Sequence, residues 1–217
     1  MRPLVVIGAG GFGRETLDVV EALNAASPTF ELLGVADDGP SAANLQRLAQ
    51  RGITHLGGLS TIPRGVELAV AVGSPRARRA IVEQLHRGGH KYPSLIHPDT
   101  MTGSGFEHGV GLIALGGVSV GTNVSLGAHV HLNAHAVIGH DAVLDDYVSV
   151  NPNATVSGEV HVGSDTLVGA SATILQGLTL SPGCLVGAAA CVTRSIRSAD
   201  TTVVGIPAAP LTKEEHP

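Results

Sequence analysis

Aromatic residues are scarce in this chain: they make up 2% of the sequence, and tryptophan is absent. A core with so few rings must be filled by aliphatic side chains. Cysteine is scarce too, and Cys184 and Cys191 are too few for a disulfide-stapled secreted scaffold. We therefore expect two reduced, packed thiols without a catalytic role, in a cytoplasmic protein.

Positive charge is also limited. The chain has 13 Lys and Arg against 18 Asp and Glu, which gives a formal net charge of -5. This balance lacks the basic footprint of a nucleic-acid-binding protein, so we expect no nucleic acid partner. The first ten residues hold only a short apolar run that ends in glycines, too short for a membrane span and without a signal-peptide cleavage pattern. We expect no membrane insertion.

A strict period of six runs through the second half of the chain. The aliphatic residues that recur at every sixth position are Val120, Leu126, Leu132, Ile138, Leu144, Val150, Val156, Val162, Val168, Ile174, Leu180, Val186 and Val192. A helix repeats its apolar face every 3.6 residues and a strand every two, so neither accounts for this spacing. The period is typical of a hexapeptide β-helix. A β-sandwich, the alternative, would need strands of varying length and spacing.

In such a β-helix, one hexad supplies each short strand and corner, and about eighteen residues complete a coil. Gly, Asn, Asp or Ser often follows the aliphatic residue, as in Gly121, Gly127 and Asn133. We expect Gly or Asn to accept the positive φ of the corner. The frame weakens between His97 and Ser119, as expected for a terminal coil.

The N-terminal part has a different pattern. Leu4 to Ile7 is a predicted buried strand, followed by a G-x-G-x-x-G turn and a predicted helix from Arg14 to Leu23. A second strand, Glu31 to Ala36, ends at the carboxylates Asp37 and Asp38. Backbone N–H groups at such a turn favour phosphate, and a carboxylate after the second strand can bind a ribose or a base. The glycines concerned are Gly8, Gly10, Gly11 and Gly13. Without a ligand, they would form only a tight strand-to-helix turn.

The predicted elements up to residue 96 are too few for a complete dinucleotide-binding fold. We expect a Rossmann-like domain over 1–96 and a β-helix domain with a C-terminal cap over 97–217. The cap is assigned to the apolar segment 203–208, which could cover unpaired strand edges. In the predicted helix 75–87, Arg76, Arg78 and Arg79 are expected to form a solvated face.

Histidines cluster in the repeat, at His129, His131, His135, His140 and His161. Residues six apart lie on different faces of a β-helix, and only residues about eighteen apart stack. His129, His135 and Asp141 share one hexad position on three different faces, so they cannot converge in one chain, and we expect no metal site. A zinc site shared between chains remains an alternative.

The adjacent residues His140 and Asp141 have a clearer chemical use. A neutral imidazole accepts a proton near pH 7, and a neighbouring carboxylate fixes its tautomer and stabilises the imidazolium. An amine or hydroxyl that attacks a thioester needs such a base. The alternative is a surface histidine that only titrates.

Taken together, several segments resemble the NeuD/PglD-type sugar acyltransferases. They are the glycine turn 8–13, Asp37-Asp38, the segment 95–98, the segment 133–158 (NAHAVIGHDAVLDDYVSVNPNATVSG) and the closing segment 204–208. The resemblance covers essentially the whole chain. It implies an α/β Rossmann-like subdomain followed by an all-β left-handed parallel β-helix, assembled as a homotrimer.

The resemblance also implies an activity: acetyl transfer from acetyl-CoA to the amino group of a nucleotide-linked amino sugar, without metal. His140 matches the family's catalytic base and Asp141 its acidic partner. The implied substrate-binding residues are Gly8, Gly10, Gly11, Gly13, Arg14, Asp37 and Asp38. The implied acetyl-CoA-binding residues are Ser149, Gly158, Ala170, Gly187 and Ala188.

Two positions depart from the family pattern. Ser149 stands where some members have a second histidine, and Phe12 stands where a histidine often lies in the glycine turn. Ser149 can still donate a hydrogen bond, whereas Phe12 indicates a changed sugar pocket. O-acetylation of a sugar such as sialic acid, a non-catalytic nucleotide-sugar-binding subunit, and a NAD-dependent oxidoreductase remain alternatives. The nucleotide, whether UDP, GDP or dTDP, is also open.

Overall fold

The computed structural model describes residues 1–211, without the side chain of Arg87. The chain folds into two compact units, Met1–Pro98 and a second unit that begins at Asp99. The end of the predicted second domain, 212–217, lies outside the described residues. Within residues 1–211, no helix has both the length and the apolar character needed to cross a membrane.

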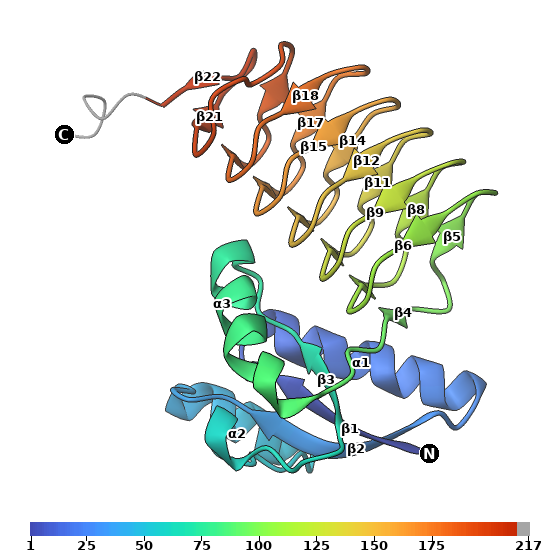
Figure 1. Cartoon of the computed structure of the whole chain (residues 1–217), viewed down its shortest axis with the longest axis vertical. Helices are drawn as coiled ribbons and strands as arrows, with labels where there is room; N and C mark the ends of the chain where they lie inside the picture. Colours follow the sequence, from blue (N-terminus) through green and yellow to red (C-terminus); the bar gives the residue numbers. More distant parts are fainter. Residues whose placement is uncertain (212–217) are drawn as a thin grey trace. The chain divides into compact units, whose positions relative to one another are not determined.

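The first unit is a small α/β fold, as predicted (Figure 1). Its elements are β1 (Arg2–Ile7), α1 (Gly11–Ala26), β2 (Phe30–Ala36), α2 (Ala42–Gln50), the 3₁₀ turn η1 (Leu59–Thr61), β3 (Glu67–Val70), α3 (Pro75–Leu85), the 3₁₀ turn η2 (His86–Gly88) and β4 (Leu95–Ile96). A three-stranded parallel sheet has the order β2-β1-β3, so β1 is central. Ile7 pairs with Ala36 on one side and Val70 on the other, which brings the carboxyl ends of all three strands to one edge.

The sequence of α1 explains both its packing and its open start. Leu17 and Val20 are buried, so one face of the helix lies in the core. The N-cap is Gly10, which has no side chain to bond the first backbone N–H groups, and the first turn carries no acidic residue. Neither the cap residue nor an acidic side chain of the first turn therefore bonds these N–H groups.

The second unit is a parallel β-helix of two-residue strands (Figure 1). Its coil strands are β5 (Met101–Thr102), β6 (Glu107–His108), β7 (Ile113–Ala114), β8 (Ser119–Val120), β9 (Ser125–Leu126), β10 (His131–Leu132), β11 (Val137–Ile138), β12 (Val143–Leu144), β13 (Ser149–Val150), β14 (Thr155–Val156), β15 (His161–Val162), β16 (Leu167–Val168), β17 (Thr173–Ile174), β18 (Thr179–Leu180), β19 (Leu185–Val186) and β20 (Cys191–Val192). Coil strands pair with the strand three places further on, as Val137 of β11 does with Thr155 of β14. The predicted fold class, an α/β subdomain followed by a left-handed parallel β-helix of hexapeptide repeats, is confirmed.

The second residue of each strand from β8 to β20 is the predicted aliphatic one, and all of these side chains are buried. The first residue often points outward, as the exposed Val143 and Thr179 illustrate. The coil frame begins before the regular repeat: β5 and β6 pair in register with β8 and β9. Thr102 and His108 occupy their aliphatic positions but are exposed, because they lie in the terminal coil.

The expected role of the glycines that follow the aliphatic residue was wrong. Positive φ falls two residues later, as at Asn123 with a φ of 57°. Gly121 needs its lack of a side chain for another reason, because a Cβ there would lie 2.7 Å from the backbone nitrogen of His140 in the next coil. Glycine at this position therefore allows close stacking of coils.

The segment predicted to cap the β-helix adds two strands to one of its faces. β21 (Thr202–Val204) pairs in parallel with β19, and β22 (Ala209–Pro210) pairs antiparallel with β21. The backbone N–H of Ala208 donates to the carbonyl oxygen of Cys191 at 2.7 Å. This hairpin covers strand edges that would otherwise be left unpaired at the end of the coils.

Candidate active site

His140 and Asp141 form a hydrogen-bonded pair at the corner between β11 and β12. Nδ1 of His140 lies 2.7 Å from Oδ2 of Asp141. An ionised carboxylate only accepts hydrogen bonds, so Nδ1 donates and Nε2 of the neutral ring keeps its lone pair. The two side chains are 55% and 47% exposed, respectively. More than half of the imidazole side chain is therefore open to a reacting molecule.

The coils on either side hold the backbone of this pair. The N–H of Asp141 donates to the carbonyl oxygen of Thr122 at 2.9 Å, and the carbonyl oxygen of His140 accepts from the N–H of Glu159 at 2.8 Å. Asp141 has a φ of 58°, a left-handed conformation that aspartate adopts more readily than most residues. The side chains thus project from a corner fixed by its neighbours.

Asp141 is held as a carboxylate. A hydrogen bond from Asn123 and then one from His140 hold the pKa of Asp141 below its usual range. Nδ2 of Asn123 lies 3.0 Å from Oδ1, the oxygen that His140 does not use. The negative charge beside the ring favours the imidazolium once a proton arrives. The pair therefore has the features of a general base and its partner.

A second histidine–carboxylate pair lies elsewhere in the β-helix. Nε2 of His161 on β15 is 3.0 Å from Oδ1 of Asp145, and the two side chains are 49% and 40% exposed. This pair uses Nε2, whereas His140 uses Nδ1. It provides an internal comparison for the His140 corner.

Four of the residues expected to contact acetyl-CoA lie at two different corners of the β-helix. Gly158 lies in the coil after His140, against the imidazole ring. Ala170, Gly187 and Ala188 follow β16 and β19, at a different corner, where the N–H of Ala189 donates to the carbonyl oxygen of Ala170 at 2.8 Å. A single chain therefore does not bring Ala170, Gly187 and Ala188 to His140.

Ser149 is the first residue of β13 and is 1% exposed. It pairs in register with His131 and Leu167, on a face that contains neither β11 nor β12. The described chain thus keeps Ser149 away from the His140 corner.

The glycine turn after β1 combines close packing with an open surface. Gly8 has a φ of 111°, and a Cβ there would lie 2.8 Å from the carbonyl oxygen of Ala71. A Cβ on Gly13 would overlap the carbonyl oxygen of Gly8, so helix and strand meet without a side chain between them. Gly10 and Gly11, in contrast, have open space where a Cβ would lie. Their backbone is accessible to an anion at the start of α1.

The carboxylates after β2 shape this region. Asp37 accepts from the N–H of Ala9 at 2.8 Å and from that of Gly39 at 2.9 Å, one at each oxygen. Asp38 accepts from the N–H of Leu59 at 2.8 Å. Asp37 therefore ties the glycine turn to the end of β2, and Asp38 ties that same end to η1.

A cavity of about 270 Å³ lies at the carboxyl ends of the strands. Its lining residues are Ile7, Gly8, Asp37, Asp38, Leu59, Val72 and Ile81. Open parallel sheets bind ligands at this edge. A lining of aliphatic side chains and two carboxylates suits a flat ring that carries N–H or O–H donors.

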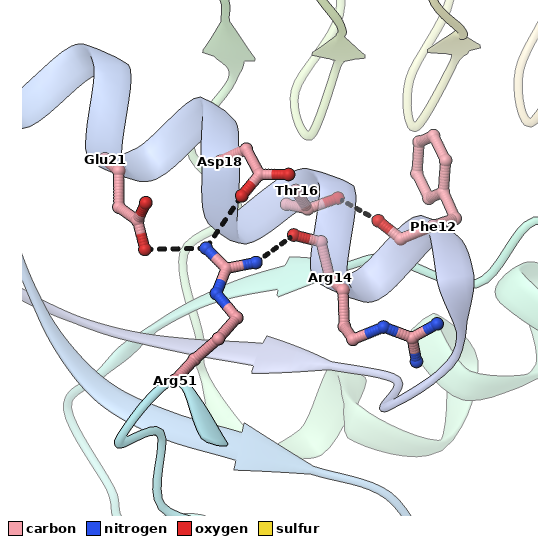
Figure 2. Close-up of polar contacts among 6 residues, drawn as sticks. All are labelled: Phe12, Arg14, Thr16, Asp18, Glu21 and Arg51. Carbon is pink, nitrogen blue, oxygen red and sulfur yellow. Dashed lines mark hydrogen bonds and ion pairs between the residues drawn. The ribbon is translucent and has the colours of Figure 1, made fainter. Parts of the chain in front are cut away.

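Arg14 does not line this cavity. One Nη atom lies 2.9 Å from the carbonyl oxygen of Ala9 and 2.7 Å from Oδ1 of Asn44. Figure 2 shows the neighbouring contacts, in which Arg51 bonds the carbonyl oxygen of Arg14 and forms ion pairs with Asp18 and Glu21. Arg14 thus braces the glycine turn and lines a separate hollow beside α2.

The prediction of a solvated arginine face on α3 was wrong at one position. Arg78 is fully buried, and its guanidinium donates to the carbonyl oxygen of Val72 at 2.8 Å. Arg78 thereby holds the backbone segment that follows β3, next to the cavity. Leu59 and Ile81 in the cavity wall were also missed, since no motif marks them. Asn123 could have been found by counting eighteen residues back from Asp141.

Metal ligands do not assemble in the part of the chain that the structure describes. No group of three His, Cys, Asp or Glu side chains within residues 1–211 could hold an ion.

Comparison with known proteins gives a family and several structural relatives. A family model described as the PglD N-terminal domain matches residues 3–85. The acetyltransferase domain of PglB from Neisseria gonorrhoeae is 31% identical with a TM-score of 0.82, and the match covers 97% of this chain and 100% of that one. That domain is also known in complex with acetyl coenzyme A.

Two further structures cover nearly the whole chain. WeeI from Acinetobacter baumannii is 26% identical with a TM-score of 0.82, over 97% of this chain and 100% of that one. A histidine-to-asparagine variant of perosamine N-acetyltransferase from Caulobacter crescentus, in complex with CoA and GDP-perosamine, is 25% identical with a TM-score of 0.85, over 98% of each chain. None of the curated proteins compared with this chain matches it.

Proposed function

The chain belongs to the NeuD/PglD-type family of sugar acyltransferases, and on this premise we propose that it transfers an acetyl group from acetyl-CoA to the amino group of a nucleotide-linked amino sugar. The observation that carries the proposal is the 2.7 Å contact between Nδ1 of His140 and Oδ2 of Asp141, which leaves the lone pair on Nε2 of a side chain that is 55% exposed. The structural match to an N-acetyltransferase solved with CoA and GDP-perosamine supports the same reaction class.

In the proposed reaction, the neutral sugar amine attacks the carbonyl carbon of the acetyl thioester. Nε2 of His140 takes a proton from the amine, and Asp141 stabilises the imidazolium. Oriented N–H donors stabilise the oxyanion. The C–S bond then breaks, the amide forms, and the CoA sulfur leaves as the thiol after His140 returns the proton. No acyl-enzyme is needed, and the buried Cys184 is not placed to form one.

We propose that acetyl-CoA lies along a seam between chains of a homotrimer. Gly158 would contact it from one chain, and Ala170, Gly187 and Ala188 would contact it from a neighbour. The buried Ser149 is not placed for such a contact. Within a single chain, Gly158 and Ala170 lie at different corners. This separation supports the arrangement, because a ligand that contacts both corners needs two chains.

For the acceptor, we assign the nucleoside to the strand-end cavity. The N–H groups of Gly10 and Gly11 would bind its phosphates. Gly8 and Gly13, which lack side chains, would let the backbone of the turn lie close to the nucleotide. Asp38 would accept a hydrogen bond from the base or ribose, while Asp37 and Arg14 hold the turn in shape. We also propose a cytoplasmic location, supported by two free cysteines.

The test is CoA thiol release from acetyl-CoA, followed with a thiol reagent, across UDP-, GDP- and dTDP-linked amino sugars. We expect turnover with one of them and a loss of about 10² to 10⁴ in His140→Ala, the usual range for a general base. The loss shrinks if the acceptor amine is already largely neutral. His161→Ala is the matched control, because His161 is similarly exposed and carboxylate-paired. It should retain turnover.

Other outcomes redirect the assignment. Release only with sialic acid or another hydroxyl acceptor would indicate O-acetylation. Measurable CoA binding without turnover on either acceptor class would indicate a nucleotide-sugar-binding subunit. Equal losses in His140→Ala and His161→Ala would contradict the role of His140 as the base.

A further inference from the structure

Asn123 occupies the same place as Asp141 one coil earlier. The two residues are eighteen positions apart, and their φ values are 57° and 58°. Nδ2 of Asn123 donates to Oδ1 of Asp141 at 3.0 Å. Nothing in the hexad pattern requires an amide here, since other positions of this kind hold His129, Tyr147 or Ser171.

The hydrogen bond from the side-chain amide of Asn123 completes a series of three hydrogen-bonded side chains. Asn123 bonds one carboxylate oxygen of Asp141, and His140 bonds the other. Asp141 is 47% exposed, so water competes for its oxygens and could let the carboxylate rotate. Two bonds on opposite oxygens fix that rotation, whereas the bond from His140 alone would leave the carboxylate free to turn with the ring.

We propose that Asn123 is a positioning residue for acetyl transfer: by orienting Asp141, it holds His140 as the Nδ1–H tautomer and leaves Nε2 free to take the proton of the acceptor. This inference rests on the proposed function of His140. Asn123 itself touches neither the imidazole nor the reacting atoms.

The surroundings of the imidazole make its tautomer depend on this series of hydrogen bonds. The ring lies against Gly158, which has no side chain to hold it. At the corner of His140 and the corners stacked directly on it, the titratable groups besides His140 are Asp141 and Glu159, whose backbone N–H donates to the carbonyl oxygen of His140. Thr122 and Asn123 in the preceding coil are neutral. The carboxylate of Asp141 therefore fixes the ring through its hydrogen bond to Nδ1, and Asn123 orients that carboxylate.

The first variant is Asn123→Gly, because glycine accepts the left-handed backbone and removes only the amide. The matched control is Asp165→Gly: Asp165 has a φ of 58° and lies at the third corner, away from both His140 and Ala170. Asn123→Asp is the second variant. It keeps the side-chain shape and the backbone preference but, when ionised, cannot donate.

The tautomer of His140 is read from ¹⁵N chemical shifts at a pH where the ring is neutral. The kcat and the KM for acetyl-CoA are measured on the same variants, and the thermal unfolding midpoint checks that each variant is folded. In Asn123→Gly and Asn123→Asp we expect a shift toward the Nε2–H tautomer and a fall in kcat on the order of tenfold, with KM unchanged. Asp165→Gly should match the wild type in the tautomer, kcat and KM.

The tautomer is read without substrate, so the two hypotheses can fail separately. An unchanged tautomer and kcat in both Asn123 variants, with His140→Ala inactive, would overturn the positioning role alone. A tautomer shift in a protein that turns over no acceptor would support the positioning of the ring and contradict acetyl transfer. A loss of kcat that equally affects Asp165→Gly would reduce Asn123 to a structural residue.

Discussion

A Cβ atom added to Gly158 would lie 2.6 Å from Nε2 of His140 and 2.7 Å from Cε1, so the imidazole rests in space that any other side chain would fill. Both distances are too short for a non-bonded contact. Gly158 thus does more at this corner than permit a turn: it lets the catalytic candidate lie against the next coil with its Nδ1 on Asp141.

Gly158→Ala should displace the imidazole and lower kcat by roughly tenfold or more, within the range expected for a misplaced base. The measurement is thiol release, with the unfolding free energy determined in parallel. In a His140→Ala background the same substitution should cost little stability, because the three atoms nearest to the new Cβ all belong to His140. Additive stability losses in this double-mutant cycle would contradict the contact.

Asp141→Asn should lower the plateau of kcat. The asparagine carries no charge to stabilise the imidazolium that forms in the reaction, and its amide can present its NH2 group to Nδ1, so the ring is no longer held as the Nδ1–H tautomer. The pH profile of kcat tests this. An unchanged plateau would show that Asp141 does not act on the ring.

The same carboxylate affects acid stability. The pKa of Asp141 is lowered in the folded protein, by Asn123 first and His140 second, so its stabilising effect is present above the ordinary pKa of aspartate. That effect is lost as the pH falls through the lowered pKa. The unfolding midpoint of the wild type should therefore exceed that of Asp141→Asn near neutral pH, and the difference should vanish in acid. A difference that grows in acid would have the wrong sign.

Ile81→Trp should raise the KM for the nucleotide sugar by about tenfold and leave the KM for acetyl-CoA unchanged, because the indole would occupy the strand-end cavity. Leu45→Trp is the control, since Leu45 is partly exposed on α2 and does not line that cavity. Initial rates with each substrate varied in turn separate the two constants. An equal effect on both would argue for general damage to the fold.

Cys184 should remain unreactive toward maleimide until the protein unfolds. Its side chain is 1% exposed, and burial raises the pKa of its thiol, so the reactive thiolate is scarce. Mass spectrometry of labelled protein before and after denaturation tests this. Rapid labelling of Cys184 in the folded state would show that the end of the β-helix opens, and would add a background to the thiol-release measurement.

Much of the architecture could be predicted because its cause is periodic. An aliphatic residue at every sixth position, from Val120 to Val192, is sufficient to indicate a triangular coil, since neither a helix nor a flat sheet buries that spacing. The strand and glycine turn at the N-terminus predicted the α/β unit for the same kind of reason. His140 and Asp141 are neighbours in the chain, so their pairing could be anticipated as well.

Other features could not be inferred from spacing. Gly121 was expected to have a positive φ, but it is glycine because the next coil passes too close for a side chain. Arg78 was expected to be solvated, and it is buried because the carbonyl oxygen of Val72 takes its guanidinium. Leu59 and Ile81 meet in one cavity from separate parts of the chain.

The sequence by itself therefore determined the coil, the order of the two units and the acid–base pair, because each depends on local periodicity or adjacency. The tertiary structure alone decided that Asn123 takes the second oxygen of Asp141 and that Gly121 must lack a side chain. Both depend on contacts between residues eighteen or more positions apart. Such contacts are set by the stacking distance of coils and by side-chain orientation, neither of which a pattern of residue types encodes.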